Sequence, residues 1–279
     1  MIIKLDRQKI FNYFIIKMVI KMFKINKIND EVYNFNDEDM CSVYLIIGED
    51  KALVIDTGMP SKDSLLKEIR KITDKELIVV LTHGHFDHVG HLDEFSSFYI
   101  SKEDLECFEN KNISYDKDKL HLLKDQQIFD LKNIQVKAIK TPGHTKGSYT
   151  FIDEKHHILF TGDQFGSGCG VWMQVLEALP LSEYIKSIDN FLNHLNENYN
   201  YNIDDWSYYP GHLGQEYTGK LGYNPLNTNM VRNLKELSIK LLANKIDLLP
   251  SKALSFNNEK SYYVSYKNAE MVIRKSLIK

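Results

Sequence analysis

The chain has 279 residues, of which 43% are hydrophobic and 26% are charged, and its formal net charge is −3 at pH 7. This composition is typical of a globular protein with one large domain or two small ones. Because the net charge is slightly negative, no overall basic field favours nucleic acid as a partner.

Residues 1–21 mix apolar and charged side chains, and we interpret them as an N-terminal extension to a single domain at residues 22–279. A secretory signal needs an uninterrupted apolar run and a small-residue cleavage site, and neither is present. A membrane-spanning helix needs about 20 mostly apolar residues, whereas Lys9, Lys17 and Lys21 interrupt this stretch. A basic, apolar helix lying on a membrane surface is the alternative.

From residue 22 onward, short apolar runs alternate with turn signals and helix-like segments. Residues 43–48 and 52–58 predict a β-hairpin, and residues 61–72 predict a helix. Further strands are expected at 76–83, 98–101, 134–144, 148–153, 157–163 and 206–212, with a closing hairpin at 261–273. Helices are expected at 182–195, capped by Ser182, and at 229–246. This mixture predicts sheets covered by helices in one continuous domain.

Five residues with chemically reactive side chains share one position relative to these elements. Each lies just beyond the C-terminal end of a predicted strand: Asp56, His83, His144, Asp163 and His212. Side chains carried there on loops can converge on one cleft while the sheet holds them rigidly. The pattern therefore predicts a site at the edge of a sheet.

Residues 82–88, T-H-G-H-F-D-H, give the strongest local signal in the chain. On a helix, residues i and i+2 face different directions, so His83 and His85 could not bind the same ion there. On a sharp loop after a buried strand they can, and Asp87 and His88 are then directed to a second position. Imidazole and carboxylate suit zinc, which takes four or five ligands at about 2.0 to 2.2 Å.

One loop cannot supply two coordination spheres, and three later turns offer the remaining ligands. His144 lies in T-P-G-H-T, Asp163 in F-T-G-D and His212 in Y-P-G-H. Any one of these residues by itself is more often a structural histidine or a turn residue than a ligand. Their ordered combination with the 82–88 loop predicts a metal site.

The order HxHxDH, then His, Asp and His, resembles the metallo-β-lactamase fold superfamily over about residues 30–225. The resemblance implies an α/β fold, a four-layer αββα sandwich with mixed, mostly antiparallel sheets and a dinuclear site along one edge. It also implies the ligands of each ion. The first ion is bound by His83, His85 and His144, the second by Asp87, His88 and His212, and Asp163 bridges the two.

The resemblance also gives a place to Asp56, in V-I-D-T-G, which matches an aspartate that supports the site from behind the ligands. A simple turn cap at a strand end is the alternative. Two divalent cations a few ångströms apart lower the pKa of a shared water and generate a bridging hydroxide near neutral pH. That hydroxide would attack an electrophilic carbonyl or phosphorus. Asp87 is a candidate to relay a proton to the leaving group, so Asp56 and Asp87 are the candidate catalytic residues.

The residues around the predicted site limit the classes of substrate that we expect. Antibiotic lactamases lack an aspartate at the bridging position, so Asp163 favours the glyoxalase II, lactonase, phosphodiesterase and tRNA-processing branches of the superfamily. The stretch F-T-G-D-Q-F-G-S-G-C-G is similar to glyoxalase II. Those enzymes place Lys or Arg after G-C-G to hold a glutathione carboxylate, whereas this chain has Val171 and Trp172. Glutathione thioesters are therefore disfavoured.

Apolar residues near this stretch occur at Val171, Trp172, Met173 and Val175. They predict either an apolar wall beside the metal ions, suited to an acyl or aromatic group, or core packing beneath the loop. Tyrosines near the last ligand are candidate donors to an oxyanion: Tyr208, Tyr209 and Tyr217.

We therefore expect a dinuclear metal-dependent hydrolase acting on a small-molecule ester, thioester or lactone, with two zinc ions, or iron or manganese in their place. A phosphodiesterase or nuclease of the same fold and a mononuclear iron sulfur dioxygenase are the alternatives. The three cysteines form no CxxC pair, so reduced thiols in a cytoplasmic protein are the simpler interpretation. No transmembrane segment is expected, and a homodimer is left open.

Overall fold

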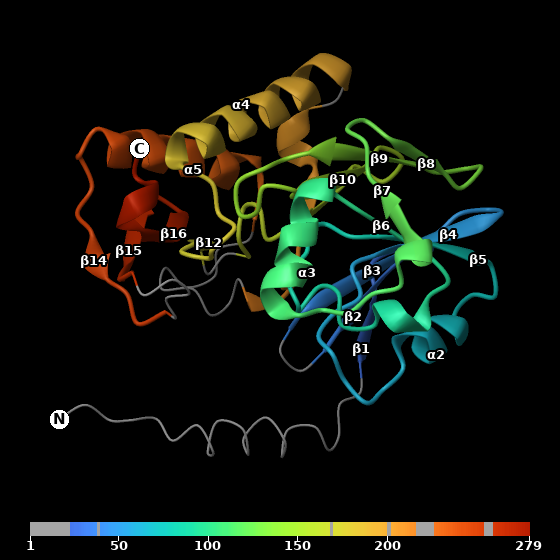
Figure 1. The fold of residues 1–279 in the computed structure, drawn as a ribbon. Coiled ribbons are helices and arrows are strands. Elements are labelled where there is room, and N and C mark those ends of the chain that lie inside the picture. The colour runs from blue at the N-terminus through green and yellow to red at the C-terminus, as the bar shows by residue number, and fades with distance from the viewer. Residues whose placement is uncertain (1–22, 38–39, 168–169, 200–201, 216–225, 254–258) are drawn as a thin grey trace.

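A computed structural model describes residues 23–37, 40–167, 170–199, 202–215, 226–253 and 259–279. The predicted extension at residues 1–21 lies outside these ranges. Figure 1 shows two central sheets, with helices α4 and α5 over one of them and helix α2 against the other.

The first sheet contains, in the part of the chain that the structure describes, seven strands in sequence order. They are β1 Lys24–Lys27, β2 Val32–Asn36, β3 Ser42–Ile47, β4 Lys51–Ile55, β5 Glu76–Val80, β6 Phe98–Ile100 and β7 Leu120–Leu122. Strands β1 to β4 pair antiparallel, whereas β4 to β7 pair parallel. The predicted hairpin is confirmed as β3–β4, while β1 and β2 were not predicted.

The second sheet has the order β13-β11-β10-β9-β8, and a smaller third sheet has the order β12-β16-β15-β14. The second consists of β8 Ile128–Asp130, β9 Gln135–Lys140, β10 Tyr149–Asp153, β11 Ile158–Gly162 and β13 Ser207–Pro210. The third consists of β12 Val171–Met173, β14 Leu249–Pro250, β15 Ser261–Tyr266 and β16 Ala269–Arg274. The closing hairpin β15–β16 therefore pairs, in parallel, with β12.

The longer helices are α2 Leu65–Arg70, α3 Leu105–Lys111, α4 Leu181–Asn198 and α5 Thr228–Leu242. Short 3-10 helices lie at Leu92–Glu94, Lys102–Asp104, Lys117–Lys119, Ile203–Asp205 and Lys275–Leu277. Among the residues that the structure places, no helix combines the length and apolar character needed to cross a bilayer.

The start of α4 differs from the prediction that Ser182 caps it. The helix begins at Leu181, and Pro180 occupies the N-cap position with no side-chain cap hydrogen bond. The fixed φ of proline suits entry into a helix, so a polar cap is not needed to start it. The backbone N–H of Ser182 lies in the first turn and donates to the carbonyl of Lys279, so the end of the chain satisfies this donor.

Among the described residues, three buried hydrophobic clusters lie between the four layers of the fold. The first cluster packs α2 and α3 against the first sheet, with Leu65 and Phe108 among its members. The second lies between the first and second sheets, with Leu53 and Phe151 among its members. The third packs α4 and α5 against the second and third sheets, around residues such as Phe191. This arrangement confirms the αββα sandwich, in which burial of these apolar faces supplies the main stabilisation.

Strand direction places the predicted site at one edge of the two sheets. Strands β4 and β5 are parallel neighbours, so the residues that follow them leave the first sheet at the same edge. Strands β11 and β13 are also parallel, and β9 runs in their direction because β9 and β11 both pair antiparallel with β10. Backbone hydrogen bonds join the two edges, from Tyr149 N–H to Thr82 O (2.8 Å) and from Ser42 N–H to Gly211 O (2.7 Å).

Candidate metal centre

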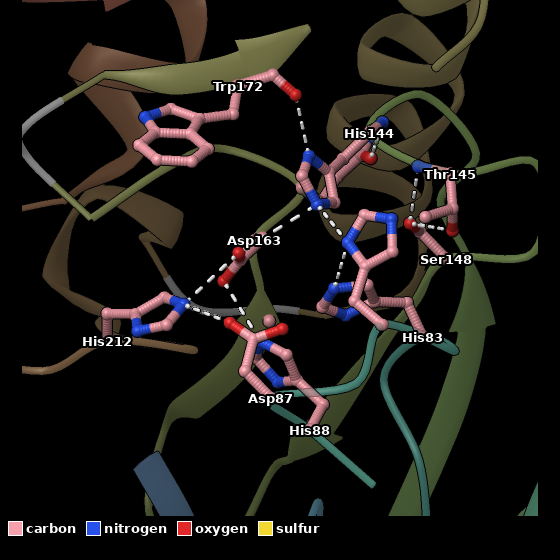
Figure 2. Close-up of polar contacts among 12 residues, drawn as sticks. His83, Asp87, His88, His144, Thr145, Ser148, Asp163, Trp172 and His212 are labelled. Carbon is pink, nitrogen blue, oxygen red and sulfur yellow. Dashed lines mark hydrogen bonds and ion pairs between the residues drawn. The ribbon is translucent and has the colours of Figure 1, made fainter. Parts of the chain in front are cut away.

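The seven predicted ligands come from four segments of the chain and meet at this edge, and Figure 2 labels all of them except His85. They are His83, His85, Asp87, His88, His144, Asp163 and His212. Asp163 directly follows β11, and His212 follows β13 after one glycine. The loop that carries His83, His85, Asp87 and His88 follows β5, and the loop that carries His144 follows β9. The strand-end positions in the sequence thus correspond to one location in space.

The imidazoles of His83, His85 and His144 form the first group of donors. The distance from Nδ1 of His85 to Nε2 of His83 is 3.1 Å, and to Nε2 of His144 it is 3.0 Å. The three ring planes cross at 80° to 84°, and the three nitrogens lie close together, so the rings surround a common point.

Hydrogen bonds on the far side of two of these rings fix which nitrogen carries the proton. Nδ1 of His144 donates to the backbone carbonyl of Trp172 at 2.8 Å. Nδ1 of His83 lies 3.0 Å from the hydroxyl oxygen of Thr82, and that hydroxyl donates to Oδ2 of Asp56 at 2.7 Å. The hydroxyl therefore accepts from His83. In both rings Nε2 keeps its lone pair, which is the form that binds a metal ion.

His85 presents its other nitrogen to the common point, and a carboxylate explains why. Its Nε2 lies 3.4 Å from Oε2 of Glu177, and Oε1 of the same carboxylate accepts a hydrogen bond from Nδ2 of Asn110 at 2.8 Å. A carboxylate behind the ring favours the tautomer with the proton on Nε2 and leaves the lone pair on Nδ1. Glu177 was not predicted from the sequence.

The second group contains the side chains of Asp87, His88 and His212. Oδ2 of Asp87 lies 3.8 Å from Nε2 of His88 and 3.4 Å from Nε2 of His212. Nδ1 of His88 donates to Oδ2 of Asp56 at 2.9 Å, so in the neutral form of the ring Nε2 carries the lone pair. That Nε2 is buried and, among the described residues, has no hydrogen-bond partner. A buried acceptor of this kind is costly unless something else satisfies it.

Asp163 lies between the two groups. Its Oδ2 is 3.8 Å from Nε2 of His144 in the first group and 3.3 Å from Nε2 of His212 in the second, while its Oδ1 is 3.6 Å from Nε2 of His88. Gly211 allows this approach, because a Cβ there would lie 2.3 Å from Oδ1 of Asp163. The glycine of the P-G-H turn is thus required by close packing against the carboxylate.

The charge state differs between the two groups. Burial, and then repulsion among neighbouring rings, lowers the pKa of His83 well below its ordinary value, and burial lowers that of His144 to about 4. These imidazoles are therefore neutral at pH 7. Burial alone would also lower the pKa of His88, but the carboxylates of Asp87 and Asp163 raise it well above its ordinary value. A bound cation would replace that proton, since both neutralise the carboxylates.

The donor set fits two divalent ions. Each group offers three nitrogen or oxygen donors and shares one carboxylate, which matches the four ligands that zinc commonly takes in proteins. Nε2 of His88 and Oδ1 of Asp163 are both buried and have no hydrogen-bond partner among the described residues, and a cation that replaced the His88 proton would satisfy both atoms.

A cavity of about 320 Å³ opens onto the donors. Three large apolar side chains line it although each is substantially exposed: Phe86 at 43%, Trp172 at 42% and Leu176 at 41%. Strand β12 explains the orientation of the second of these, because alternate side chains of a strand face opposite ways. Val171 and Met173 are buried in the core, while Trp172 faces the cavity. The sequence left two alternatives for this stretch, an apolar cavity wall or core packing, and the structure contains both.

The tyrosines proposed as oxyanion donors do not gather at the site. Tyr208 is buried beneath α4 and α5, and its hydroxyl forms a hydrogen bond with Thr228. Tyr209 packs between the two sheets against Tyr44. Both predictions are wrong because these strand residues point into the core. Tyr217 lies outside the described residues.

Comparison with known proteins decides the family. The sequence model of the metallo-beta-lactamase superfamily matches residues 36–212, which include all seven predicted ligands. The chain belongs to the metallo-beta-lactamase superfamily. A solved metallo-beta-lactamase from Pontibacter korlensis superposes with a TM-score of 0.56 and covers 68% of this chain and 90% of its own. Its sequence identity is 15%, so this likeness concerns the fold.

Two curated members of the superfamily are similar in sequence. A probable hydroxyacylglutathione hydrolase of Schizosaccharomyces pombe is 32% identical over 172 residues, which are 59% of this chain and 59% of the relative. A probable zinc-dependent hydrolase of polyketide biosynthesis from Bacillus velezensis is 37% identical over 112 residues, 37% of this chain and 49% of the relative. The chain thus spans about half the length of these relatives.

Proposed function

We propose that this protein is a dinuclear metal-dependent hydrolase whose first ion is held by His83, His85 and His144. The second ion is held by Asp87, His88 and His212, and Asp163 bridges the two. The observation that carries this proposal is the position of the Asp163 carboxylate, 3.8 Å from a donor of the first group and 3.3 Å from a donor of the second. Two donor groups that share one anion between them fit a pair of cations.

When bound, the two ions lower the pKa of a water molecule so that it serves as the nucleophile near neutral pH. The protein side chains fix the geometry. The Asp56 carboxylate accepts a hydrogen bond from Nδ1 of His88. It also accepts hydrogen bonds from the N–H and the hydroxyl of Thr82, and that hydroxyl in turn accepts one from His83. One buried carboxylate therefore positions a ligand in each group. Asp56 is a positioning residue in this proposal. Asp87 would bind the second ion, and because it lines the cavity it is also placed to pass a proton to the leaving group of a substrate bound there.

The lining of the cavity supports a substrate with an apolar acyl group. Apolar side chains from separate segments line the cavity, among them Met59, Phe86 and Trp172, and the one lysine or arginine among the described lining residues is Lys111 at the end of α3. The Schizosaccharomyces relative is named for the hydrolysis of hydroxyacylglutathione, which is a thioester, and the Bacillus relative is named a zinc-dependent hydrolase. We therefore propose a thioester, ester or lactone as substrate and zinc as the native metal.

Residues 22–279 form one domain in this proposal, because β16 pairs with the strand that carries Trp172.

Elemental analysis of the purified protein, together with a substrate panel, tests the proposed function. We expect about two zinc ions per chain and hydrolysis of acyl thioesters or lactones that a strong chelator abolishes. The panel includes a phosphodiester, a β-lactam and a persulfide assayed by oxygen consumption. Turnover of the phosphodiester alone would identify a phosphodiesterase. One iron per chain with oxygen uptake would identify a sulfur dioxygenase, and either result would reject the proposal.

Replacement of Trp172 by alanine tests the acyl-binding wall. We expect kcat/KM for a long-chain acyl thioester to fall at least about tenfold relative to the acetyl thioester, because apolar contact with the longer chain is lost. Metal content should not change, since His144 donates to the backbone carbonyl of Trp172, which the substitution retains. Ile239→Ala is the matched control, because Ile239 is 46% exposed and does not line this cavity. Equal losses for both acyl chain lengths would argue against an acyl-binding role.

A further inference from the structure

Cys41 is a thiol that the proposed ligand set does not use, and it is held beside that set. It directly precedes β3 and is 1% exposed. Its backbone N–H donates to Oδ1 of Asp37 at 3.0 Å. The next residue, Ser42, donates its N–H to the carbonyl of Gly211 at 2.7 Å and accepts from Leu213 N–H through its hydroxyl. The segment that carries Cys41 is thus fastened on both sides of His212.

The sulfur faces the second donor group. Sγ of Cys41 lies 3.9 Å from Oδ2 of Asp87, and the two atoms lie within 4.8 Å of a ring nitrogen of His212. Ligands around one zinc ion, at 2.0 to 2.3 Å from it, are separated from one another by distances of this size. Cys41 also lines the same cavity as these two side chains.

An independent observation indicates that a cation belongs at this point. Nε2 of His88 is buried, has no hydrogen-bond partner among the described residues and lies 3.8 Å from the same oxygen of Asp87 that faces the sulfur. His88 itself is 0% exposed, so water from the surface does not satisfy this nitrogen. The sulfur, the Asp87 carboxylate and a ring nitrogen of His212 therefore adjoin one position, and the nitrogen of His88 lies on the other side of the same carboxylate oxygen, 3.8 Å from it.

We propose that the sulfur of Cys41 is a further ligand of the ion in the second position, an inference that rests on the proposed dinuclear centre. The S–H bond breaks as the sulfur–metal bond forms, and the proton passes to solvent, so the thiolate brings one more negative charge to that ion. The two positions then differ chemically. The first offers imidazole nitrogens, whereas the second includes a soft sulfur donor that favours zinc or cobalt over manganese or magnesium.

Cobalt(II) reports the ligand directly. Thiolate-to-cobalt charge transfer gives a strong near-ultraviolet absorption that imidazole and carboxylate ligands do not give. The full chain is stripped of metal, loaded with two equivalents of cobalt(II) and compared with Cys41→Ser and Cys107→Ser. Cys107 is the matched control, because it is also buried and lies beside the first donor group, near His85 and Glu177.

We expect the charge-transfer band in the wild-type chain and in Cys107→Ser, and its loss in Cys41→Ser with the weaker visible cobalt bands retained. Cobalt binding without any sulfur band in the wild-type chain would overturn the role of Cys41 and leave the dinuclear centre standing. A band that persists in Cys41→Ser would assign the sulfur to another cysteine and also overturn it. Failure of the wild-type chain to bind cobalt would reject the centre and the thiolate together.

Metal preference supplies a second readout that does not depend on the spectrum. In competition between zinc and manganese, Cys41→Ala should lose zinc selectivity at one of its two sites, whereas Cys107→Ala should keep it. Thermal unfolding of the metal-free variants identifies any loss that comes from misfolding. Unchanged selectivity in a folded Cys41→Ala chain would contradict the proposal.

Discussion

Replacing Asp163 by asparagine is expected to lower hydrolysis by on the order of 10²–10³-fold, the scale seen when one electrostatic contact to the reacting centre is removed. The substitution keeps the shape of the side chain but removes the negative charge that lies between the two donor groups. The bound metal should also fall from about two ions per chain toward one, because both positions lose a shared ligand.

Asp153→Asn is the matched control for this experiment. Asp153 is also a buried aspartate paired with a histidine, but it ends β10 at the opposite edge of the sheet, where it contacts His156. Metal analysis and initial rates on both variants then separate the loss of a ligand from the general cost of removing a buried charge. If the Asp163 variant retained two ions and full turnover, the bridging role would be wrong.

Replacing Asp56 by asparagine is expected to weaken metal binding about 10- to 100-fold, the usual cost of removing a carboxylate behind a metal-binding histidine. Asp56 accepts hydrogen bonds from Thr82 N–H, from the Thr82 hydroxyl and from Nδ1 of His88. Asparagine keeps one acceptor oxygen, so at least one of these buried donors loses its partner at a cost of about 1–3 kcal/mol. The measurements are chelator competition for zinc and urea unfolding of the metal-free chain.

The choice of asparagine matters because Asp56 has φ = +61°. Asparagine tolerates this left-handed backbone better than alanine does, so Asp56→Ala should unfold at lower urea than Asp56→Asn even if the two bind metal equally poorly. A simple turn cap would show the stability loss without any change in metal affinity. That outcome would remove Asp56 from the proposed site.

Local pattern was sufficient to predict the main strands and two long helices, and its errors have physical causes. Strands β1 and β2 were missed because their sequences, KINK and VYNFN, carry asparagine and lysine that are typical of loops. Pairing with β3 decides their structure. Helix α3 was missed because LECFENK is short and begins without a side-chain cap. It forms because Cys107 and Phe108 are buried against the first sheet.

The sequence by itself determined the family, the layered fold and the seven side chains that we propose as ligands. Those residues follow strands, and strands that run in the same direction within one sheet end at the same edge, so their convergence follows from chain order and direction. The order of the 82–88 loop and the three later turns along the chain then indicates which donors belong to which of the two proposed ions.

Only the tertiary structure decided what lies behind and beside those donors. Glu177 contacts His85 from 92 positions away in the chain, and Cys41 faces Asp87 from 46 positions away. Neither residue lies in a recognisable sequence motif. A carboxylate behind a histidine ring, or a thiol beside a carboxylate, needs only to be close in space, and many different sequences can place it there. Proximity between distant segments is set by the packing of the layers as a whole, and no local stretch of sequence contains it.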